Sequence, residues 1–183
     1  MKQLLSLILL LSASCTLQAQ VRLAEPEYIG QVLMLTSDTT AQELTRENVR
    51  QQVKSTHFGA IPLPGTSLLD KTKMSSVIAG PHAPHSFSAG VHRFLIRTDS
   101  SDQDPQMLIA IWKMTVKKKN REHKTGEVGI LTGASMNVTG SDIPFQAQKY
   151  GEHSCLVTLP EMEPGEYAIT FPGQPQVSTF TIK

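Results

Sequence analysis

The regular alternation of apolar and polar residues in the last third of the chain constrains the fold most. Three extended segments, separated by short turns rich in proline and glycine, occupy residues 154–159, 166–171 and 177–182. In the middle segment, Tyr167, Ile169 and Phe171 share one face of the expected strand. Because the turns are too short for a crossover helix, these segments predict an antiparallel meander of three strands.

Four earlier segments show an extended pattern less regularly, and they occupy residues 28–35, 75–79, 91–97 and 107–112. The segment Met107–Trp112 is apolar on both faces, which predicts a central strand buried between two layers. The segment Gln42–Ser55 fits two structures. Thr40 and Glu43 form a helix capping box, whereas the neighbouring segments favour strands, so a short helix and a pair of edge strands are equally open.

Together these patterns predict an all-β fold. We expect an immunoglobulin-like antiparallel β-sandwich of about seven to nine strands, formed by a single domain over residues 20–183. Cys155 is the one cysteine in that range, so the domain has no internal disulfide and depends on its hydrophobic core. Alternation places Cys155 on the same face as Val157 and Leu159, as a small buried hydrophobic residue.

Residues 1–19 are typical of a cleaved signal peptide. Lys2 precedes the apolar run Leu4–Leu11, whose length of about eight residues is far below the roughly twenty that a membrane-spanning helix needs. Cleavage after Ala19 predicts a soluble protein in the periplasm or outside the cell. In the alternative interpretation, Ser12–Cys15 is a lipoprotein box and the chain is an outer-membrane lipoprotein, held to the membrane only by lipid on Cys15.

The charge balance argues against nucleic acid as a partner. The chain has 17 Lys and Arg and 16 Asp and Glu residues, and removal of Lys2 with the signal peptide leaves 16 of each. A neutral protein lacks the overall field that gathers nucleic acid, and the basic run near residue 120 has no interleaved aromatic residues to stack on bases. We expect a protein or glycan partner at the cell envelope, and no cofactor.

Three motifs carry a resemblance to a known group of proteins, and they are the basic stretch at residues 117–121, Phe-Gln-Ala-Gln-Lys-Tyr-Gly at 145–151, and residues 156–171 with Pro-Gly-Glu-Tyr at 164–167. In these motifs, mainly over its C-terminal half, the chain is similar to secreted proteins of unknown function from gut-type Bacteroidota. The resemblance implies export and an immunoglobulin-like sandwich. It implies no activity and no site residue.

A histidine cluster is the first candidate site, and it consists of His82, His85 and His92. Imidazole is the commonest ligand of transition metals, and three of them within a turn and a strand predict a metal site. The spacing matches no established zinc motif, so solvated loop histidines are the alternative. If the three rings converge, a metal-dependent hydrolase is the corresponding function.

A basic run in a predicted hairpin is the second candidate site, with the cationic residues Lys117, Lys118, Lys119, Arg121 and Lys124. A local cationic patch can bind an anionic ligand even on a neutral protein. The alternative is a solvated sheet edge, whose lysines prevent aggregation.

Motifs for nucleophilic catalysis are absent from the sequence, which has no Gly-x-Ser-x-Gly elbow. Trp112 lies in an apolar run and is expected to be a core residue. We therefore expect a non-catalytic binding or accessory module of the cell envelope. The remaining alternative is a structural subunit of a surface assembly, in which chains exchange a strand.

Overall fold

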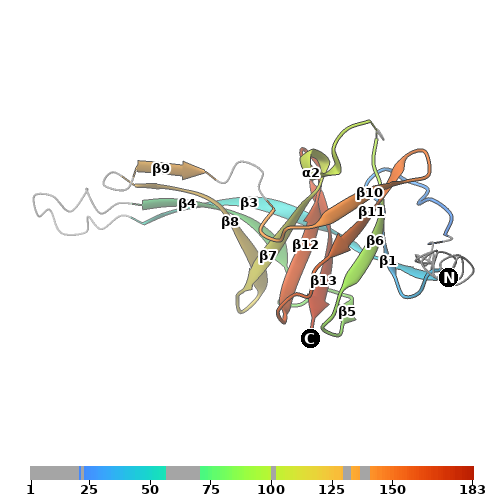
Figure 1. Ribbon diagram of the computed structural model, residues 1–183. Coiled ribbons are helices and arrows are strands. Elements are labelled where there is room, and N and C mark those ends of the chain that lie inside the picture. Colours follow the sequence, from blue (N-terminus) through green and yellow to red (C-terminus); the bar gives the residue numbers. More distant parts are fainter. Residues whose placement is uncertain (1–20, 22, 57–70, 100–101, 130–132, 137–140) are drawn as a thin grey trace, which may run out of the picture.

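The computed structural model describes residues 21, 23–56, 71–99, 102–129, 133–136 and 141–183. The expected signal peptide and lipoprotein box lie outside the described residues. Over these residues the fold is β-rich, with one helical turn, α2 (Pro105–Leu108), and strands β1 (Val32–Leu35), β2 (Ala41–Glu43), β3 (Arg46–Thr56), β4 (Lys71–Ala79), β5 (Ser86–Phe87), β6 (His92–Arg97), β7 (Ala110–Val116), β8 (Asn120–Gly129), β9 (Gly133–Met136), β10 (Gln146–Tyr150), β11 (Ser154–Leu159), β12 (Gly165–Thr170) and β13 (Gln176–Ile182) (Figure 1). Within those ranges, no helix is both long and apolar enough to span a bilayer.

The strands form two antiparallel sheets. The first sheet has the order β10-β11-β6-β1-β2. In the second, β12, β7, β8, β4, β3 and β13 pair in that order, and β13 also pairs with β12, so these six strands form a closed ring. Two short strands add to this ring: β5 pairs with β13 in parallel, and β9 pairs with β8.

The main hydrophobic core lies between the first sheet and strands β7, β12 and β13, which is the packing of a β-sandwich. Tyr167, Ile169 and Phe171 all contribute to this core, as their alternation predicts. Phe180 lies at its centre, fully buried, with ring centroids 5.2 Å from Phe94 and 5.6 Å from Tyr167. The expected all-β fold with antiparallel sheets is therefore confirmed, and this packing is consistent with a β-sandwich, to which the closed six-stranded ring is added.

The expected C-terminal meander is wrong. Only β12 and β13 pair with each other, whereas β11 pairs with β10 and β6 in the other sheet. Residues 160–164 cross between the sheets, so that Val157 and Leu159 lie in the same core as Tyr167 and Ile169. The alternation of apolar residues predicts which face of a strand is buried, but two such faces can pack across a core as well as side by side.

The structure decides between the two alternatives for residues 42–55 and changes the expected start of the strand at residues 107–112. Gln42–Ser55 contributes to β2 and β3, which confirms a pair of strands rather than the helix. Of the two expected edge strands, β2 lies at the edge of the first sheet, whereas β3 pairs with both β4 and β13. Met107 lies in the helical turn α2, not in a strand, because Asp104 accepts a hydrogen bond from the Gln106 amide and Pro105 fits the first helical position. In β7, Ala110 and Ile111 are buried on opposite faces where the sandwich and the ring meet, whereas Lys113, Thr115 and Val116 are exposed.

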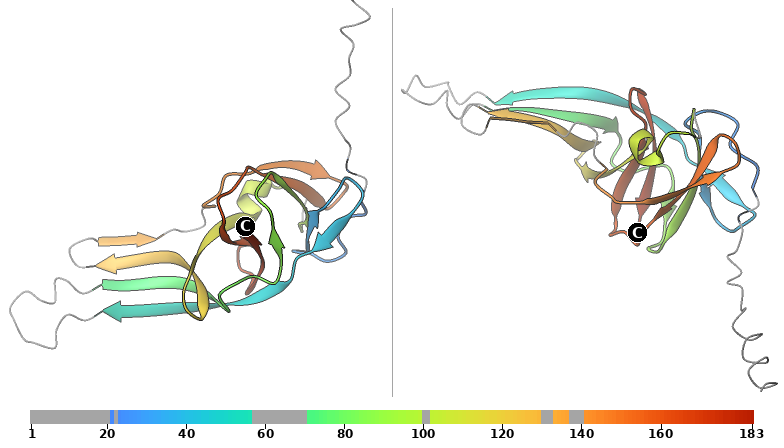
Figure 2. Two further views of the ribbon diagram at one scale, coloured as in Figure 1. Left: turned by 90° about the horizontal axis from the view of Figure 1, so that it is seen from below. Right: turned by 45° about the horizontal axis from the view of Figure 1, so that its top comes forward.

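Strands β3, β4 and β8 run beyond the ring and, with β9, form a projecting arm (Figures 1 and 2). One face of the arm carries ion pairs, including Lys54 with Glu122 at 3.3 Å. The other face carries exposed apolar side chains such as Val53 and Val128. The arm and the short edge strands bring the total to thirteen strands in the described ranges, above the expected seven to nine.

Residues at the N-terminal side of β1 cover the outer face of the first sheet. Val21 and Leu23 pack there against a second, smaller apolar cluster that includes Leu95 and Leu156. This layer explains why β6 and β11 are apolar on both faces.

Candidate functional site

One end of the six-stranded ring is closed by an ionic cluster formed by Arg121, Glu47 and Glu166. Arg121 is completely buried, and its Nη2 donates to both carboxylate oxygens of Glu47 at 2.8 Å. Its Nη1 lies 3.9 Å from Glu166 Oε2 and has no hydrogen-bond partner among the described residues. Arg121 therefore points into the ring and does not belong to the expected exposed patch, because strand alternation turns it away from its lysine neighbours.

A loop completes this closed end. The side chain of Glu166 is only 3% exposed, and it accepts hydrogen bonds from the Ala83 amide at 2.8 Å and the Thr181 hydroxyl at 2.9 Å. His82 Nδ1 lies 3.0 Å from the same carboxylate. The loop around residues 82–83 thus covers the end of the ring, and its backbone satisfies a buried charge.

An apolar layer separates this cluster from the other end of the ring. The layer contains Ile78, Met114, Ala168 and Val177, against which Val49 and Trp112 pack. The ring interior is therefore filled at its closed end and in its middle, as expected for a small barrel.

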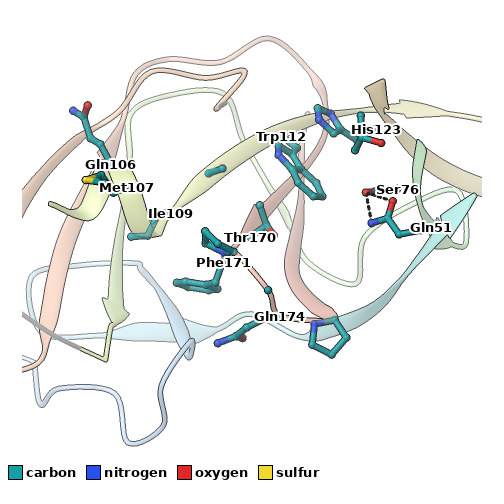
Figure 3. A pocket seen from close by; sticks show the side chains of 15 residues that line it. Gln51, Ser76, Gln106, Met107, Ile109, Trp112, His123, Thr170, Phe171 and Gln174 are labelled. Atoms are coloured by element: carbon teal, nitrogen blue, oxygen red, sulfur yellow. Dashed lines mark hydrogen bonds between the residues drawn. The ribbon is translucent and has the colours of Figure 1, made fainter. Parts of the chain in front are cut away.

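The opposite end of the ring holds a cavity of about 460 Å³, which we call the ring-end pocket (Figure 3). Its lining comes from five ring strands (β3, β4, β7, β8 and β12), from α2 and the residue after it, and from the turn after β12: Gln51, Ser76, Gln106, Met107, Ile109, Ala110, Trp112, His123, Thr125, Thr170, Phe171, Pro172, Gly173, Gln174 and Pro175. Figure 3 shows Gln51 and Ser76 on one side of the cavity and Gln106, Met107 and Ile109 on the other. Mouths of β-barrels are frequent ligand sites, and this volume is within their usual range.

A stacked pair of rings forms part of the pocket wall. The indole of Trp112 and the imidazole of His123 are nearly parallel, with an interplanar angle of 5° and centroids 4.5 Å apart. The two residues come from β7 and β8, which pair only at their hairpin end and then separate. Asp142 lies in the gap, where it accepts a hydrogen bond from the Lys113 amide at 2.9 Å and lies 3.2 Å from His123 Nδ1. These contacts hold the stack in place.

The polar groups of the ring-end pocket are neutral. None of the described residues that line it is Asp, Glu, Lys or Arg. Burial lowers the pKa of His123, an effect that the neighbouring Asp142 carboxylate opposes, so the imidazole is uncharged at pH 7. Gln51 and Ser76 lie opposite each other on β3 and β4 and share a hydrogen bond of 3.0 Å between Gln51 Nε2 and Ser76 Oγ.

The three histidines of the expected metal site have separate partners. His82 pairs with Glu166, and His92 Nε2 lies 3.0 Å from the Ser88 carbonyl oxygen. His85 lies 2.9 Å from the Gln42 amide and 2.9 Å from the Thr45 hydroxyl. No group of three His, Cys, Asp or Glu side chains suited to a metal occurs in the described ranges, so the structure does not bring these imidazoles together into a site.

The remaining residues of the expected cationic patch lie on the β7–β8 hairpin and its neighbourhood. Lys117, Lys118 and Lys119 are exposed at the turn, which the Lys117 amide closes by donating to the Asn120 carbonyl at 2.7 Å. Lys124 forms an ion pair with Glu127. With Arg121 inside the ring, the patch is smaller than the sequence suggests.

Cys155 is buried in the main core, as expected. Burial raises the pKa of its thiol to about 11, so the thiol stays protonated at neutral pH.

Sequence reasoning missed the ring-end pocket and misplaced Trp112. The indole is only partly buried, and it lines the pocket instead of filling the main core. Gln51, Ser76 and His123 were not singled out because nothing in their local sequence marks them. The available signal is their cross-strand alignment, which becomes visible only once β3, β4 and β8 are paired.

Comparison with known proteins gives no match to a protein-family model, to a curated protein or to a solved structure.

Proposed function

We propose that this protein is an exported, non-catalytic binding module that holds a small uncharged ligand in the ring-end pocket. The observation that carries this proposal is the pocket itself, an open cavity of about 460 Å³ at the mouth of a closed ring, with a stacked Trp112–His123 wall and uncharged polar side chains. Because paired β-strands hold Trp112, His123, Gln51 and Ser76, this part of the wall is formed before a ligand arrives, which reduces the entropy cost of binding.

The groups around the pocket favour binding over catalysis. Ser76 lies directly opposite His123 where β4 pairs with β8, but its hydroxyl is hydrogen-bonded to Gln51 and the residue is completely buried. A nucleophile needs a base that removes its proton, and here the hydrogen-bond partner of the Ser76 hydroxyl is the side-chain amide of Gln51, which is not a base. The Cys155 thiol, with its raised pKa, lies in the core and supplies no nucleophile either.

The cellular setting and the finer fold assignment belong to the same proposal. The signal-peptide pattern of residues 1–19 supports export to the envelope. The two-layer packing of the first sheet on β7, β12 and β13 supports an immunoglobulin-like relationship for that part of the chain. The six-stranded ring is an addition to this architecture, and it is the ring that carries the proposed site.

Trp112 is the only tryptophan of the chain, so its fluorescence reports directly on the ring-end pocket. We would titrate the full chain with uncharged planar heterocycles and with uncharged sugars, following tryptophan fluorescence and the unfolding temperature. At least one class is expected to change the fluorescence saturably and to raise the unfolding temperature, since a ligand stabilises the state that it binds.

The matched variants are Trp112→Ala in the pocket and Tyr28→Ala, which removes an exposed aromatic side chain elsewhere. The ligand-induced rise in unfolding temperature should disappear in Trp112→Ala and persist in Tyr28→Ala. If Trp112→Ala does not fold, Gln106→Ala on the exposed turn α2 replaces it. A wild-type protein that responds to neither class would refute the proposed function.

A further inference from the structure

Resting on the proposed function, we infer that the ring-end pocket binds a neutral saccharide, with one face of a sugar ring on Trp112 and its hydroxyl groups hydrogen-bonded to the glutamine side chains of the wall.

The indole of Trp112 is suited to a sugar ring because it is flat and fixed. Its stack on His123 is nearly parallel, and the Asp142 carboxylate lies 3.2 Å from His123 Nδ1. The face of an aromatic ring carries partial negative charge, and the C–H groups on one face of a sugar ring carry the complementary partial positive charge. A platform that is already ordered loses little entropy when a ring is placed on it.

The polar wall matches hydroxyl groups better than it matches an apolar ligand. Six uncharged polar side chains line the pocket: Gln51, Ser76, Gln106, Thr125, Thr170 and Gln174. Each glutamine amide is both donor and acceptor, which is what a hydroxyl group needs from its partner. An apolar ligand would displace water from these groups without replacing its hydrogen bonds, and each such loss is unfavourable.

The absence of charged side chains from the described lining residues further limits the chemical class of the ligand. The described lining residues include no cation that would pair with a phosphate or carboxylate and no anion that would pair with an amine. A charged ligand enclosed there would lose hydration without gaining a partner. His123 is uncharged at pH 7 because burial lowers its pKa, so it does not supply the missing cation. Nucleotides, amino acids and acidic sugars are therefore disfavoured relative to neutral sugars.

The shape of the pocket limits the size of the ligand. A cavity of about 460 Å³ accommodates a small ligand rather than a polymer. The mouth is bordered by Met107 and Gln106 on the turn α2, and Met107 is 77% exposed. This open rim allows a mono- or disaccharide to enter, or the end of a longer glycan to project outward.

The test titrates the full chain with glucose, galactose, mannose, N-acetylglucosamine and their common disaccharides, with indole as the uncharged aromatic probe and glucuronate as the charged sugar. The readouts are Trp112 fluorescence for the sugars and the unfolding temperature for every probe, because indole itself fluoresces like tryptophan. A neutral sugar is expected to bind saturably, and glucuronate should bind at least tenfold more weakly than glucose.

Two glutamine variants locate the bound sugar. Gln106→Ala should weaken binding about tenfold, because the sugar loses a hydrogen bond at the pocket mouth. Gln148→Ala changes an exposed residue of β10, outside the pocket, and should leave the dissociation constant unchanged. Equal affinities of Gln106→Ala, Gln148→Ala and wild type for the sugar would overturn the assignment of the site.

The outcomes separate this inference from the proposed function. If indole binds and no neutral sugar does, the saccharide inference is overturned while the proposed function stands. If no sugar changes Trp112 fluorescence, and neither indole nor any sugar raises the unfolding temperature, both are overturned.

Discussion

Replacing Arg121 by methionine tests the ionic cluster at the closed end of the ring. The substitution removes a completely buried cation and leaves the carboxylates of Glu47 and Glu166 without it, and the Glu166 side chain is itself only 3% exposed. Removal of one partner from a buried ion pair costs about 3–5 kcal/mol. We therefore expect the free energy of unfolding of Arg121→Met to fall by that amount.

Urea unfolding, followed by Trp112 fluorescence and by circular dichroism, measures this loss. With an m-value of about 2 kcal/mol/M, a loss of about 4 kcal/mol lowers the urea midpoint by about 2 M at unchanged slope. In a thermal scan, the unfolding temperature should fall by roughly 6–20 °C, at about 2–4 °C per kcal/mol for a chain of this size. A loss below about 1 kcal/mol would show that the cluster is not buried as described.

Two controls separate charge from packing. Lys118→Met removes an exposed cation from the same hairpin and should change stability by less than about 0.5 kcal/mol. The triple variant Arg121→Met/Glu47→Gln/Glu166→Gln leaves no carboxylate without a partner and should recover most of the loss. If the triple variant is as unstable as the single one, lost packing and hydrogen bonds explain the effect, and the uncompensated carboxylates do not.

Three further outcomes are expected. Because burial raises the pKa of Cys155 to about 11, iodoacetamide at pH 8 should label it only after denaturation, and labelling of the native protein, read by mass spectrometry, would contradict this. The pKa of Glu25 is lowered from 4.5 to about 2, chiefly by the Ser154 hydroxyl and then by the amides of residues 152–153, so its contribution is fully present above pH 4.5 and is lost as the pH falls through 2. Glu25→Gln should thus be less stable than wild type at pH 7 by a gap that narrows towards pH 2 in urea titrations, whereas a constant gap would exclude this linkage. Phe180→Ala leaves a cavity at the centre of the core and should lower the free energy of unfolding by about 3–5 kcal/mol in the same assay, and a change below 1 kcal/mol would argue against its central position.

The sequence predicted buried faces well and strand partners poorly. The alternation in β12 placed Tyr167, Ile169 and Phe171 in the core, where they lie. The same alternation sends Glu166 to the opposite face, which in an ordinary sandwich is solvent. Here that face forms the interior of the ring, and the pairing of β13 with β3 that closes the ring joins segments too far apart in the chain for local patterns to reveal.

The same limit explains the candidate site. The basic run looked like a uniform cationic surface, yet strand alternation puts Arg121 inside the ring, and Lys117–Lys119 are exposed because they form the turn between β7 and β8. The ring-end pocket draws residues from β3, β4, β7, β8 and the turn after β12, so no contiguous motif encodes it. Trp112 illustrates the point: its apolar neighbours predict burial, and only the separation of β7 from β8 exposes part of the indole.

The closed ring also sets the order in which the chain can fold. The Gln176 and Asn48 side chains, which hydrogen-bond where β13 meets β3, are 128 residues apart in the chain. During synthesis, β3 emerges long before β13, and its outer edge has no pairing partner in the ring until residues 176–178 arrive. Contacts between such distant segments form slowly, and an unpaired edge is a site of aggregation in the meantime. We therefore expect ring closure to be a late step of folding, and the pocket can form only after β13 has been synthesised.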